Sequence, residues 1–331
     1  MRVLNLSLDE MVSNPTSLIA RRLAALSAAV GEMAVLAPSG NGGKVRQFFD
    51  LWRRAESALK EKKYDLITVQ DTAYLALLAY LLARKFRVPL EVQVHGLEKF
   101  YGLRKLLARF LLKRADMIRV VSERLKREIS TRAYVLPVYT QIPSQPPLYK
   151  GGGEGGDFVF LTVGRLVPVK NIQLQIRALA RVVKEFPNVR LVIVGDGPEH
   201  ENLKRKTKSE KVEEKIRFEG RQENLERYYQ DADVFLLTSN SEGWGVVVTE
   251  AAAYGLPIIM TDVGLAGEFI ENGENGIVIP VGDEDALVSA MRRIIKDADL
   301  RARLGTAAHR TFLSLPTPRA AIQKQVEAWR S

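Results

Sequence analysis

The sequence of 331 residues has no cysteine, three histidines and no long uninterrupted apolar segment. Without cysteine the chain can form no disulfide bond, thiolate metal site or cysteine nucleophile, and this absence is typical of cytosolic proteins. No apolar run approaches the roughly 18 residues that a transmembrane helix needs, and the N-terminus becomes polar too early for a signal peptide. The histidines at positions 95, 200 and 309 share no ligand spacing. We therefore expect a cytoplasmic protein without a metal site.

The chain is long enough for two domains and has an ordinary globular composition, with 46% hydrophobic and 27% charged residues. Short apolar runs typical of buried strands alternate with helical segments throughout. In the first half the runs cover 3–6, 34–37, 66–69, 90–94, 117–121 and 133–136. In the second half they cover 158–163, 189–194, 215–219, 234–237, 257–261 and 276–280. The alternation predicts an α/β fold with parallel sheets that helices cover on both faces.

A segment rich in proline and glycine, 140–157, marks a domain boundary. We predict a first domain over 1–148 and a second over 149–314. Both are expected to be doubly wound and Rossmann-like, facing each other across a cleft that binds ligands at the carboxyl ends of the strands. The run 151–156 fits a GxGxxG pattern, but it precedes a strand whereas the dinucleotide motif follows one, so it is interpreted as linker.

The most informative segment is 239–257, in which seven residues separate Glu242 from Glu250. It follows a predicted strand, turns through Gly243 and Gly245, and continues as an alanine-rich helix. A glycine-rich turn between strand and helix can hold a phosphate with its backbone amides and with the positive end of the helix. Two acids beside such a phosphate site indicate recognition of a sugar that carries phosphate.

Further turns of the second half also follow predicted strands. Their candidate residues are Gly164, Arg165, Lys170, Gly195 and Arg221. Arginine offers a planar fork and lysine a point charge, a combination that suits a diphosphate; the alternative is ordinary surface ion pairing. In the first half His95 follows the predicted strand 90–94, where it is either structural or functional.

Two pairs of aspartates resemble metal-binding motifs but are assigned other roles. Asp231 and Asp233 precede a strand instead of ending it, and Asp283 and Asp285 begin a helix in a charged loop. Surface and capping roles are expected for them.

The net charge of +10 is concentrated between residues 99 and 127, which hold ten Lys or Arg against two acids. Leucines and Phe110 recur there at helical spacing, so 102–114 is predicted to be a basic amphipathic helix. Such a helix can lie on an anionic membrane through Arg104, Lys105, Arg109 and Lys113. Alternatively, its apolar stripe faces the protein core and its basic face is solvated. Nucleic acid is not expected as a partner, because no recognition module accompanies the charge.

Together these residues resemble the retaining glycosyltransferases of family 4, the group 1 glycosyl transferases with the GT-B fold. The resemblance is strong over 158–305, through Gly164-Arg-Leu with Lys170, Gly195-Asp-Gly, Glu242-Gly-Trp-Gly and Glu250. It is weaker in the first half, where His95-Gly96 and 114–122 carry it. The last segment, 315–331, is similar to the helix that crosses back to the first domain in this fold.

The resemblance implies a role for each matched position. Arg165 and Lys170 would neutralise the donor diphosphate, Glu250 would bind the nucleotide ribose, and Glu242 would position the transferred sugar without acting as a nucleophile. Gly245 and the amides of Val246 and Val247 would complete the phosphate site. His95 would contact the donor sugar at the reaction centre. Arg221 lies where the base would be selected.

One segment departs from the family. Family members often carry a Gly-Gly loop after the first strand, but 9–17 contains no glycine. No acceptor residue is therefore assigned there.

The resulting hypothesis is a metal-independent, retaining glycosyltransferase. It would use a UDP- or GDP-sugar and a lipid-linked or glycan acceptor, and it would be cytoplasmic, peripheral on the inner face of the membrane, with no cofactor. The alternatives are a GT-B sugar-nucleotide epimerase and a non-catalytic protein that binds sugar nucleotides or membranes. The sugar, the base, the acceptor and the oligomeric state stay open.

Overall fold

The computed structural model describes residues 1–8, 12, 14, 17–38, 43–96, 102–129, 132–138 and 156–331. The chain divides into two compact units: unit 1 is Met1–Gln141 with Pro316–Ser331, and unit 2 is Ile142–Leu315. Most of the predicted linker, with the expected boundary at 148/149, lies outside the described residues, as do most of the loop 9–17 and the first residues of the basic stretch, 99–101. Each unit is described by itself.

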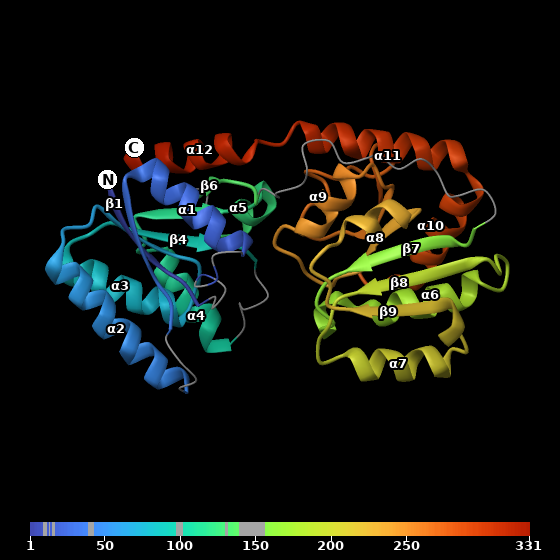
Figure 1. Ribbon diagram of the computed structural model, residues 1–331, viewed down its shortest axis with the longest axis horizontal. Helices are drawn as coiled ribbons and strands as arrows, with labels where there is room; N and C mark the ends of the chain where they lie inside the picture. The colour runs from blue at the N-terminus through green and yellow to red at the C-terminus, as the bar shows by residue number, and fades with distance from the viewer. Residues whose placement is uncertain are drawn as a thin grey trace. The chain divides into compact units, whose positions relative to one another are not determined.

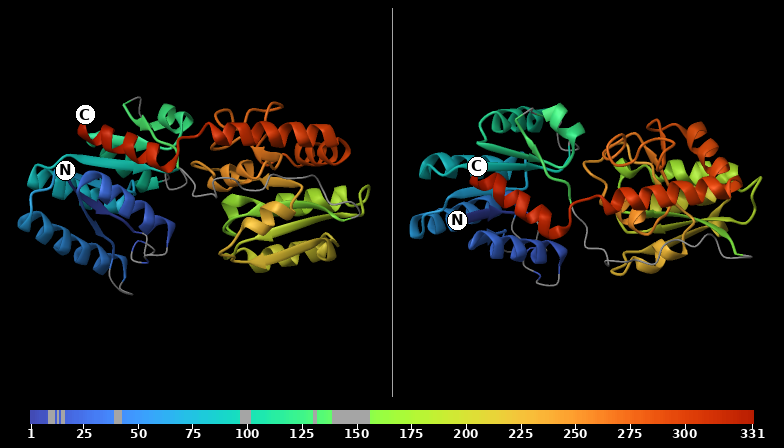
Figure 2. Two further views of the ribbon diagram at one scale, coloured as in Figure 1. Left: turned by 45° about the horizontal axis from the view of Figure 1, so that its top comes forward. Right: turned by 90° about the horizontal axis from the view of Figure 1, so that it is seen from above.

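Unit 1 is a six-stranded parallel sheet in the order β2-β1-β3-β4-β5-β6, with helices on both faces (Figure 1). Helices α1 and α12 pack together, and α2, α3 and α4 pack side by side. Both chain ends lie on this unit (Figure 2). The strands are β1 (Arg2–Leu6), β2 (Glu32–Leu36), β3 (Leu66–Val69), β4 (Leu90–Val94), β5 (Met117–Val120) and β6 (Tyr134–Val135). The helices are α1 (Leu18–Val30), α2 (Lys44–Glu61), α3 (Tyr74–Phe86), α4 (Gly102–Leu112), α5 (Glu123–Ile129) and α12 (Pro318–Arg330).

Buried polar side chains join α12 to the sheet of unit 1. Glu91 of β4 is fully buried, and its Oε1 accepts hydrogen bonds from Trp329 Nε1 at 2.8 Å and from the Tyr134 hydroxyl. On β5 the buried Arg119 donates to Gln93 Oε1 at 2.9 Å. A buried carboxylate left without these donors would be costly. The contact with Trp329 therefore ties the last helix of the chain to unit 1.

Unit 2 is a second six-stranded parallel sheet, in the order β12-β11-β10-β7-β8-β9. Helix α6 packs on α10, and α11 packs on α9. The strands are β7 (Phe158–Val163), β8 (Val189–Val194), β9 (Ile216–Gly220), β10 (Val234–Leu237), β11 (Ile258–Thr261) and β12 (Ile277–Ile279). The helices are α6 (Ile172–Val182), α7 (His200–Ser209), α8 (Glu226–Asp231), α9 (Val246–Ala253), α10 (Glu284–Lys296) and α11 (Ala298–Leu313).

The predicted fold class is confirmed. Every predicted strand is present, with ends that differ by at most two residues, and both sheets are parallel and covered by helices. Asp283 caps α10, as expected, by accepting a hydrogen bond from Ala286 N at 2.9 Å. The surface role expected for Asp233 was wrong. Its side chain is buried, and Oδ2 accepts from Val159 N at 2.7 Å, which ties the start of β10 to the neighbouring β7.

Among the described residues, no helix is both long enough and apolar enough to span a membrane.

Candidate functional site

The order of strands in unit 2 reverses between β10 and β7. From β7 the chain continues to β8 and β9 on one side, and it then returns to β10, β11 and β12 on the other. In open parallel sheets ligands bind at such a switch point, beyond the carboxyl ends of the strands. Two loops border it here: the β7 loop (164–170) and the β10 loop (238–245). They hold six of the residues that the sequence singled out: Gly164, Arg165, Lys170, Glu242, Gly243 and Gly245.

Lys170 and Glu242 of these two loops form an ion pair. The Lys170 ammonium contacts Glu242 Oε1, and both side chains are largely buried, with 23% and 9% exposed. The same carboxylate oxygen accepts a hydrogen bond from Ser239 Oγ at 2.7 Å. Ser239 is held in turn by Thr261 Oγ1, which donates to its carbonyl oxygen at 2.7 Å. A cation and a carboxylate are thus fixed side by side across the switch point.

The backbone of the β7 loop is joined to the loops on either side. Leu166 N donates to Asp196 O at 2.9 Å on the β8 side, and Asn240 N donates to Val169 O at 2.7 Å on the β10 side. These bonds satisfy backbone groups that would otherwise be unpaired at the ends of the strands. The loop is therefore a fixed platform for its charged side chains.

Two glycines allow the β8 turn to pack against the β7 loop. A Cβ atom on Gly195 would lie 1.9 Å from the Gly164 carbonyl oxygen, and one on Gly197 would lie 2.4 Å from the Leu166 carbonyl oxygen. No side chain fits at either position. This packing accounts for the glycine at 195, and its predicted contact with the donor stays a prediction.

Arg165 and Arg221 have exposed side chains on unit 2. Within the described part of the chain, Arg165 has no carboxylate partner. The alternative of an ordinary surface ion pair therefore finds no support for Arg165, whereas Lys170 does have a carboxylate partner, Glu242. Arg165 thus presents an uncompensated positive charge beside the switch point.

Helix α9 begins directly after the β10 loop. Its N-cap is Gly245, which has a left-handed backbone with φ 82° and provides no side-chain cap. The amides of Val246 and Val247 in the first turn have no partner within the helix, as at any helix N-terminus. Together with the helix dipole they can bind an anionic group. The predicted residues Gly243, Gly245, Val246 and Val247 are contiguous with Glu242 here.

Glu250 lies further along α9 and is held by a residue that the sequence did not single out. Its Oε2 accepts a hydrogen bond from the Tyr229 hydroxyl at 2.7 Å. Burial raises the pKa of the Glu250 carboxyl, and the hydrogen bond from Tyr229 opposes that rise. Glu242 and Glu250 thus differ in their partners, a lysine and a serine for one and a tyrosine for the other.

Gly264, in the segment after β11, also was not anticipated. Its φ is +53°, and a Cβ there would lie 2.9 Å from the Glu242 Cβ. Glycine at this position lets the neighbouring segment pack against the β10 loop. The sequence did offer a signal for Gly264, because it follows a predicted strand that lies beside the switch point. The same signal led to Arg165.

His95 follows β4 in unit 1 and is half-buried. Burial, followed by the positive charges of Arg119 and Arg22, lowers the pKa of its imidazole to about 3. The ring is therefore neutral at physiological pH and can act as a hydrogen-bonding group but not as a cation. The structure places it on a different unit from Arg165, Lys170, Glu242 and Glu250.

The basic helix α4 leaves part of its apolar stripe uncovered. Leu103, Leu106 and Phe110 are 84%, 64% and 41% exposed, while the core contacts come from Ala108, Leu111 and Leu112. The interpretation in which the whole stripe faces the core was therefore wrong for these three residues. Lys105, Arg109 and Lys113 are exposed beside them, and Arg104 lies over the Tyr74 ring at 5.2 Å.

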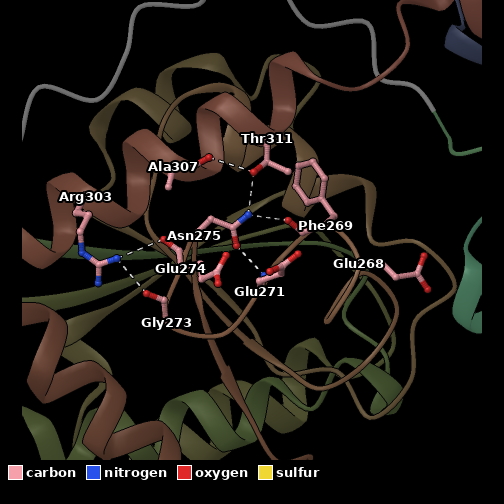
Figure 3. Close-up of a pocket in the computed structure, with 9 residues that line it drawn as sticks. All are labelled: Glu268, Phe269, Glu271, Gly273, Glu274, Asn275, Arg303, Ala307 and Thr311. Carbon is pink, nitrogen blue, oxygen red and sulfur yellow. Dashed lines mark hydrogen bonds between the residues drawn. The ribbon is translucent and has the colours of Figure 1, made fainter.

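A polar hollow of about 420 Å³ lies between the 268–275 segment and α11 (Figure 3). Several of its polar groups bind each other: Asn275 Nδ2 donates to Phe269 O at 2.8 Å and to Thr311 Oγ1 at 2.9 Å. Arg303 donates to Gly273 O at 3.0 Å. These bonds fold the segment onto α11, so we assign the hollow a structural role. In the described residues no group of three or more His, Asp or Glu side chains could hold a metal ion.

Two doubly wound parallel sheets, with a cationic loop and a helix N-terminus at the switch point of the second, define the GT-B class of glycosyltransferases. Family comparison is consistent with this class. Residues 150–311 match the family described as "Glycosyl transferases group 1", and residues 18–137 match "Glycosyltransferase Family 4". The chain belongs to glycosyltransferase family 4.

Two curated relatives match this chain over about two thirds or more of their own length. The chain is 28% identical over 280 residues to N-acetyl-alpha-D-glucosaminyl L-malate synthase of Bacillus anthracis, across 77% of this chain and 71% of that protein. It is 28% identical over 267 residues to alpha-monoglucosyldiacylglycerol synthase of Acholeplasma laidlawii, across 70% and 67%. Several further relatives are matched over less than half of their own length.

A solved structure shares the fold over the whole chain. Anabaena HepE in complex with UDP and glucose superposes with a TM-score of 0.83 at 19% identity, covering 100% of this chain and 99% of that one.

Proposed function

We propose that this protein transfers a sugar from a UDP- or GDP-sugar to a lipid-linked or membrane-proximal acceptor, with retention of anomeric configuration and without a metal ion. The observation that carries the donor assignment is the cluster at the switch point of unit 2. There Arg165, the Lys170–Glu242 pair and the N-terminus of α9 all lie in or next to the two loops that follow β7 and β10. The UDP complex of HepE, a protein of the same fold, supports a nucleotide donor.

The chemistry assigned to these groups follows from where charge develops. As the bond from the sugar to the diphosphate breaks, the leaving nucleoside diphosphate gains negative charge. Arg165, Lys170 and the amides of Val246 and Val247 are fixed donors that stabilise such charge without reorganising. They supply positive charge of the kind that a metal ion gives other transferases, so we propose that transfer is insensitive to chelators.

Glu242 is assigned to positioning. A glycosidase-type nucleophile is a carboxylate free to attack the anomeric carbon, whereas Glu242 Oε1 is engaged by Lys170 and Ser239. The other oxygen, Oε2, suits hydroxyl groups of the transferred sugar. With Glu242 in this role, retention requires that the acceptor attack on the face from which the diphosphate leaves.

The proposal is tested first on the wild-type protein. A thermal-shift screen with UDP, GDP and their sugar conjugates should raise the unfolding temperature for one base, because a ligand that binds the native state stabilises it by mass action. Hydrolysis or transfer, followed as release of UDP or GDP in the presence of EDTA, should then continue undiminished. Stabilisation by no nucleotide would contradict the donor site, and loss of activity with EDTA would contradict the metal-independent mechanism.

The membrane-proximal acceptor rests on α4. An apolar stripe that is exposed next to basic residues is the pattern of a helix that lies at the surface of an anionic bilayer. The stripe consists of Leu103, Leu106 and Phe110, and the basic residues are Lys105, Arg109 and Lys113. A relative named for a glucosyldiacylglycerol product supports an acceptor located at such a surface.

Reversing the charge of Arg104, Lys105 and Arg109 to glutamate should weaken binding to vesicles that contain phosphatidylglycerol at least about 100-fold, because each cation contributes about 1 kcal/mol. Vesicle flotation measures this affinity. The matched control reverses Lys204, Arg205 and Lys208 on α7, an exposed basic helix that carries no exposed large apolar residue. If the α4 variant bound vesicles as tightly as the wild type, α4 would not be the membrane-binding surface. If the α7 control lost as much affinity as the α4 variant, the effect would come from net charge alone.

A further inference from the structure

Tyr229 and Glu250 connect two helices of unit 2 that are separate in sequence. The Tyr229 hydroxyl, on α8, donates to Glu250 Oε2 on α9 at 2.7 Å, and the tyrosine is only 2% exposed. Among the residues that the structure describes, the Glu250 carboxylate has no second hydrogen-bond donor. One carboxylate oxygen is therefore held while the other is available to a ligand.

The Tyr229 ring is fixed by aromatic neighbours from two further parts of unit 2. It stacks on Tyr254, just after α9, with ring centroids 5.3 Å apart and planes 13° apart. It also lies against Phe235 of β10, with centroids 6.1 Å apart. Aromatic pairs at such distances add to the stability that burial provides. The phenol therefore has little freedom, and the position of its hydroxyl is set by the packing of the unit.

The electrostatic surroundings make this hydrogen bond important for the carboxylate. Burial raises the pKa of Glu250, and Tyr229 is the group that lowers it. Burial and the Glu250 charge raise the pKa of Tyr229 well above its usual range, so the phenol keeps its proton and remains a donor. The other ionisable groups that act on this cluster are Tyr254 and, through it, Glu226 of α8. No cation of the described residues contributes to the pKa shift of Glu250.

We propose that Tyr229 is a positioning residue for donor binding, which orients the Glu250 carboxylate so that its free oxygen accepts hydrogen bonds from the ribose hydroxyls of the nucleotide. This inference rests on the proposed function, which assigns Glu250 to the ribose. An ionised carboxylate accepts from both hydroxyls of a cis-diol, whereas a protonated one has lost part of that capacity. Tyr229 thus acts on the donor through Glu250 and does not itself touch the reacting atoms.

The test is Tyr229→Phe, which keeps the ring and removes the hydroxyl. We expect the Kd for UDP or GDP, whichever the wild type binds, to rise about 3- to 10-fold at neutral pH, because a hydrogen bond to a charged group is lost. Without the opposing hydrogen bond the pKa of Glu250 rises further. The loss of affinity on acidification should therefore begin at a higher pH in the variant. Calorimetric titrations between about pH 5 and pH 8 follow this shift.

The matched control is Tyr228→Phe, the same change one residue away. The Tyr228 hydroxyl contacts Glu219 and Arg227 and not Glu250. Titration of the terminal phosphate of the nucleotide contributes to the pH dependence of all variants alike, so the difference between the two variants reports Glu250. The proposal would be overturned if Tyr229→Phe had the same Kd as Tyr228→Phe and lost affinity at the same pH.

A second variant covers the case in which Tyr229→Phe does not fold. The glutamine in Glu250→Gln cannot ionise. The loss of nucleotide affinity on acidification should therefore shrink in this variant to the part that titration of the nucleotide phosphate causes. Persistence of the full loss would overturn the proposal. Where both variants fold, Tyr229→Phe should have no further effect on affinity in the Glu250→Gln background, and an equal effect in both backgrounds would reduce Tyr229 to a structural role. A wild-type protein that binds neither nucleotide would instead contradict the proposed function itself.

Discussion

Replacing Arg165 by alanine is expected to lower kcat for sugar transfer about 100- to 1,000-fold, the usual cost of removing one fixed group that stabilises transition-state charge. The unfolding temperature should not change, because Arg165 is exposed and, among the described residues, pairs with no carboxylate. Steady-state kinetics with the donor that the thermal-shift screen identifies, together with a melting curve, measure both quantities. Arg165→Lys should retain an intermediate rate, since lysine keeps the charge but not the planar fork.

Lys170→Met should cause a similar loss of activity with an added loss of stability. It leaves the largely buried Glu242 with the Ser239 hydroxyl but without its cation, and an uncompensated buried charge is costly. Arg205→Ala on α7 is the matched control, because Arg205 is exposed and, among the described residues, its side chain hydrogen-bonds to Asn202 and to no carboxylate. If Arg165→Ala kept the wild-type kcat, the assignment of the β7 loop to the leaving diphosphate would be wrong.

The fold could be predicted almost completely because its signals are local. Each strand is a short apolar run flanked by turn residues, and parallel strands covered on both faces are apolar throughout. Asp233 shows where this reasoning stops. A polar residue just before a strand looked solvent-exposed, yet β10 lies next to β7, 74 residues earlier in the chain, and the carboxylate accepts from a backbone amide there. The pairing of distant strands decided its burial.

The site could be predicted as a set of positions but not as a set of contacts. Motif position led to Arg165, Lys170, Glu242 and Glu250, all of which lie on unit 2 at the expected ends of strands or along α9. The sequence did not predict that Lys170 pairs with Glu242, because 72 residues separate them. Tyr229 was missed for a similar reason, since a tyrosine in a short charged helix shows no sign that its hydroxyl is directed at a carboxylate.

The apolar stripe of α4 illustrates a different limit. Periodicity predicts that a helix is amphipathic, but it does not say how wide a face the protein covers. In unit 1 the neighbouring α3 covers one side of α4, and Ala108, Leu111 and Leu112 make the buried contacts. Leu103 and Leu106 fall outside that contact and remain exposed. Packing therefore contradicts the interpretation in which the whole stripe faces the core, while binding of α4 to a membrane stays a prediction.

Gly195→Ala is expected to destabilise unit 2 by about 3–5 kcal/mol, a cost reserved for substitutions that force the backbone to move. The added Cβ would lie 1.9 Å from the Gly164 carbonyl oxygen, far inside van der Waals contact, and a φ of +135° is itself unfavourable for alanine. Neither neighbour is a flexible side-chain end, so relief requires that the β7 loop and the β8 turn separate. Urea unfolding measures the loss in the free energy of unfolding. The transition that belongs to unit 2 is identified as the one that bound nucleotide shifts to higher urea concentration.

Gly220→Ala is the control that isolates the steric part of this cost. Gly220 also has a positive φ, +65°, and ends the next strand, but nothing lies within 4 Å of its added Cβ. Alanine there should cost about 1–2 kcal/mol, the price of a left-handed backbone alone. Similar losses in the two variants would mean that the β8 turn can move away from the β7 loop at little cost. Arg165 and Lys170 would then not be held on a fixed platform, and the preorganised charge on which the proposed mechanism depends would lose its structural basis.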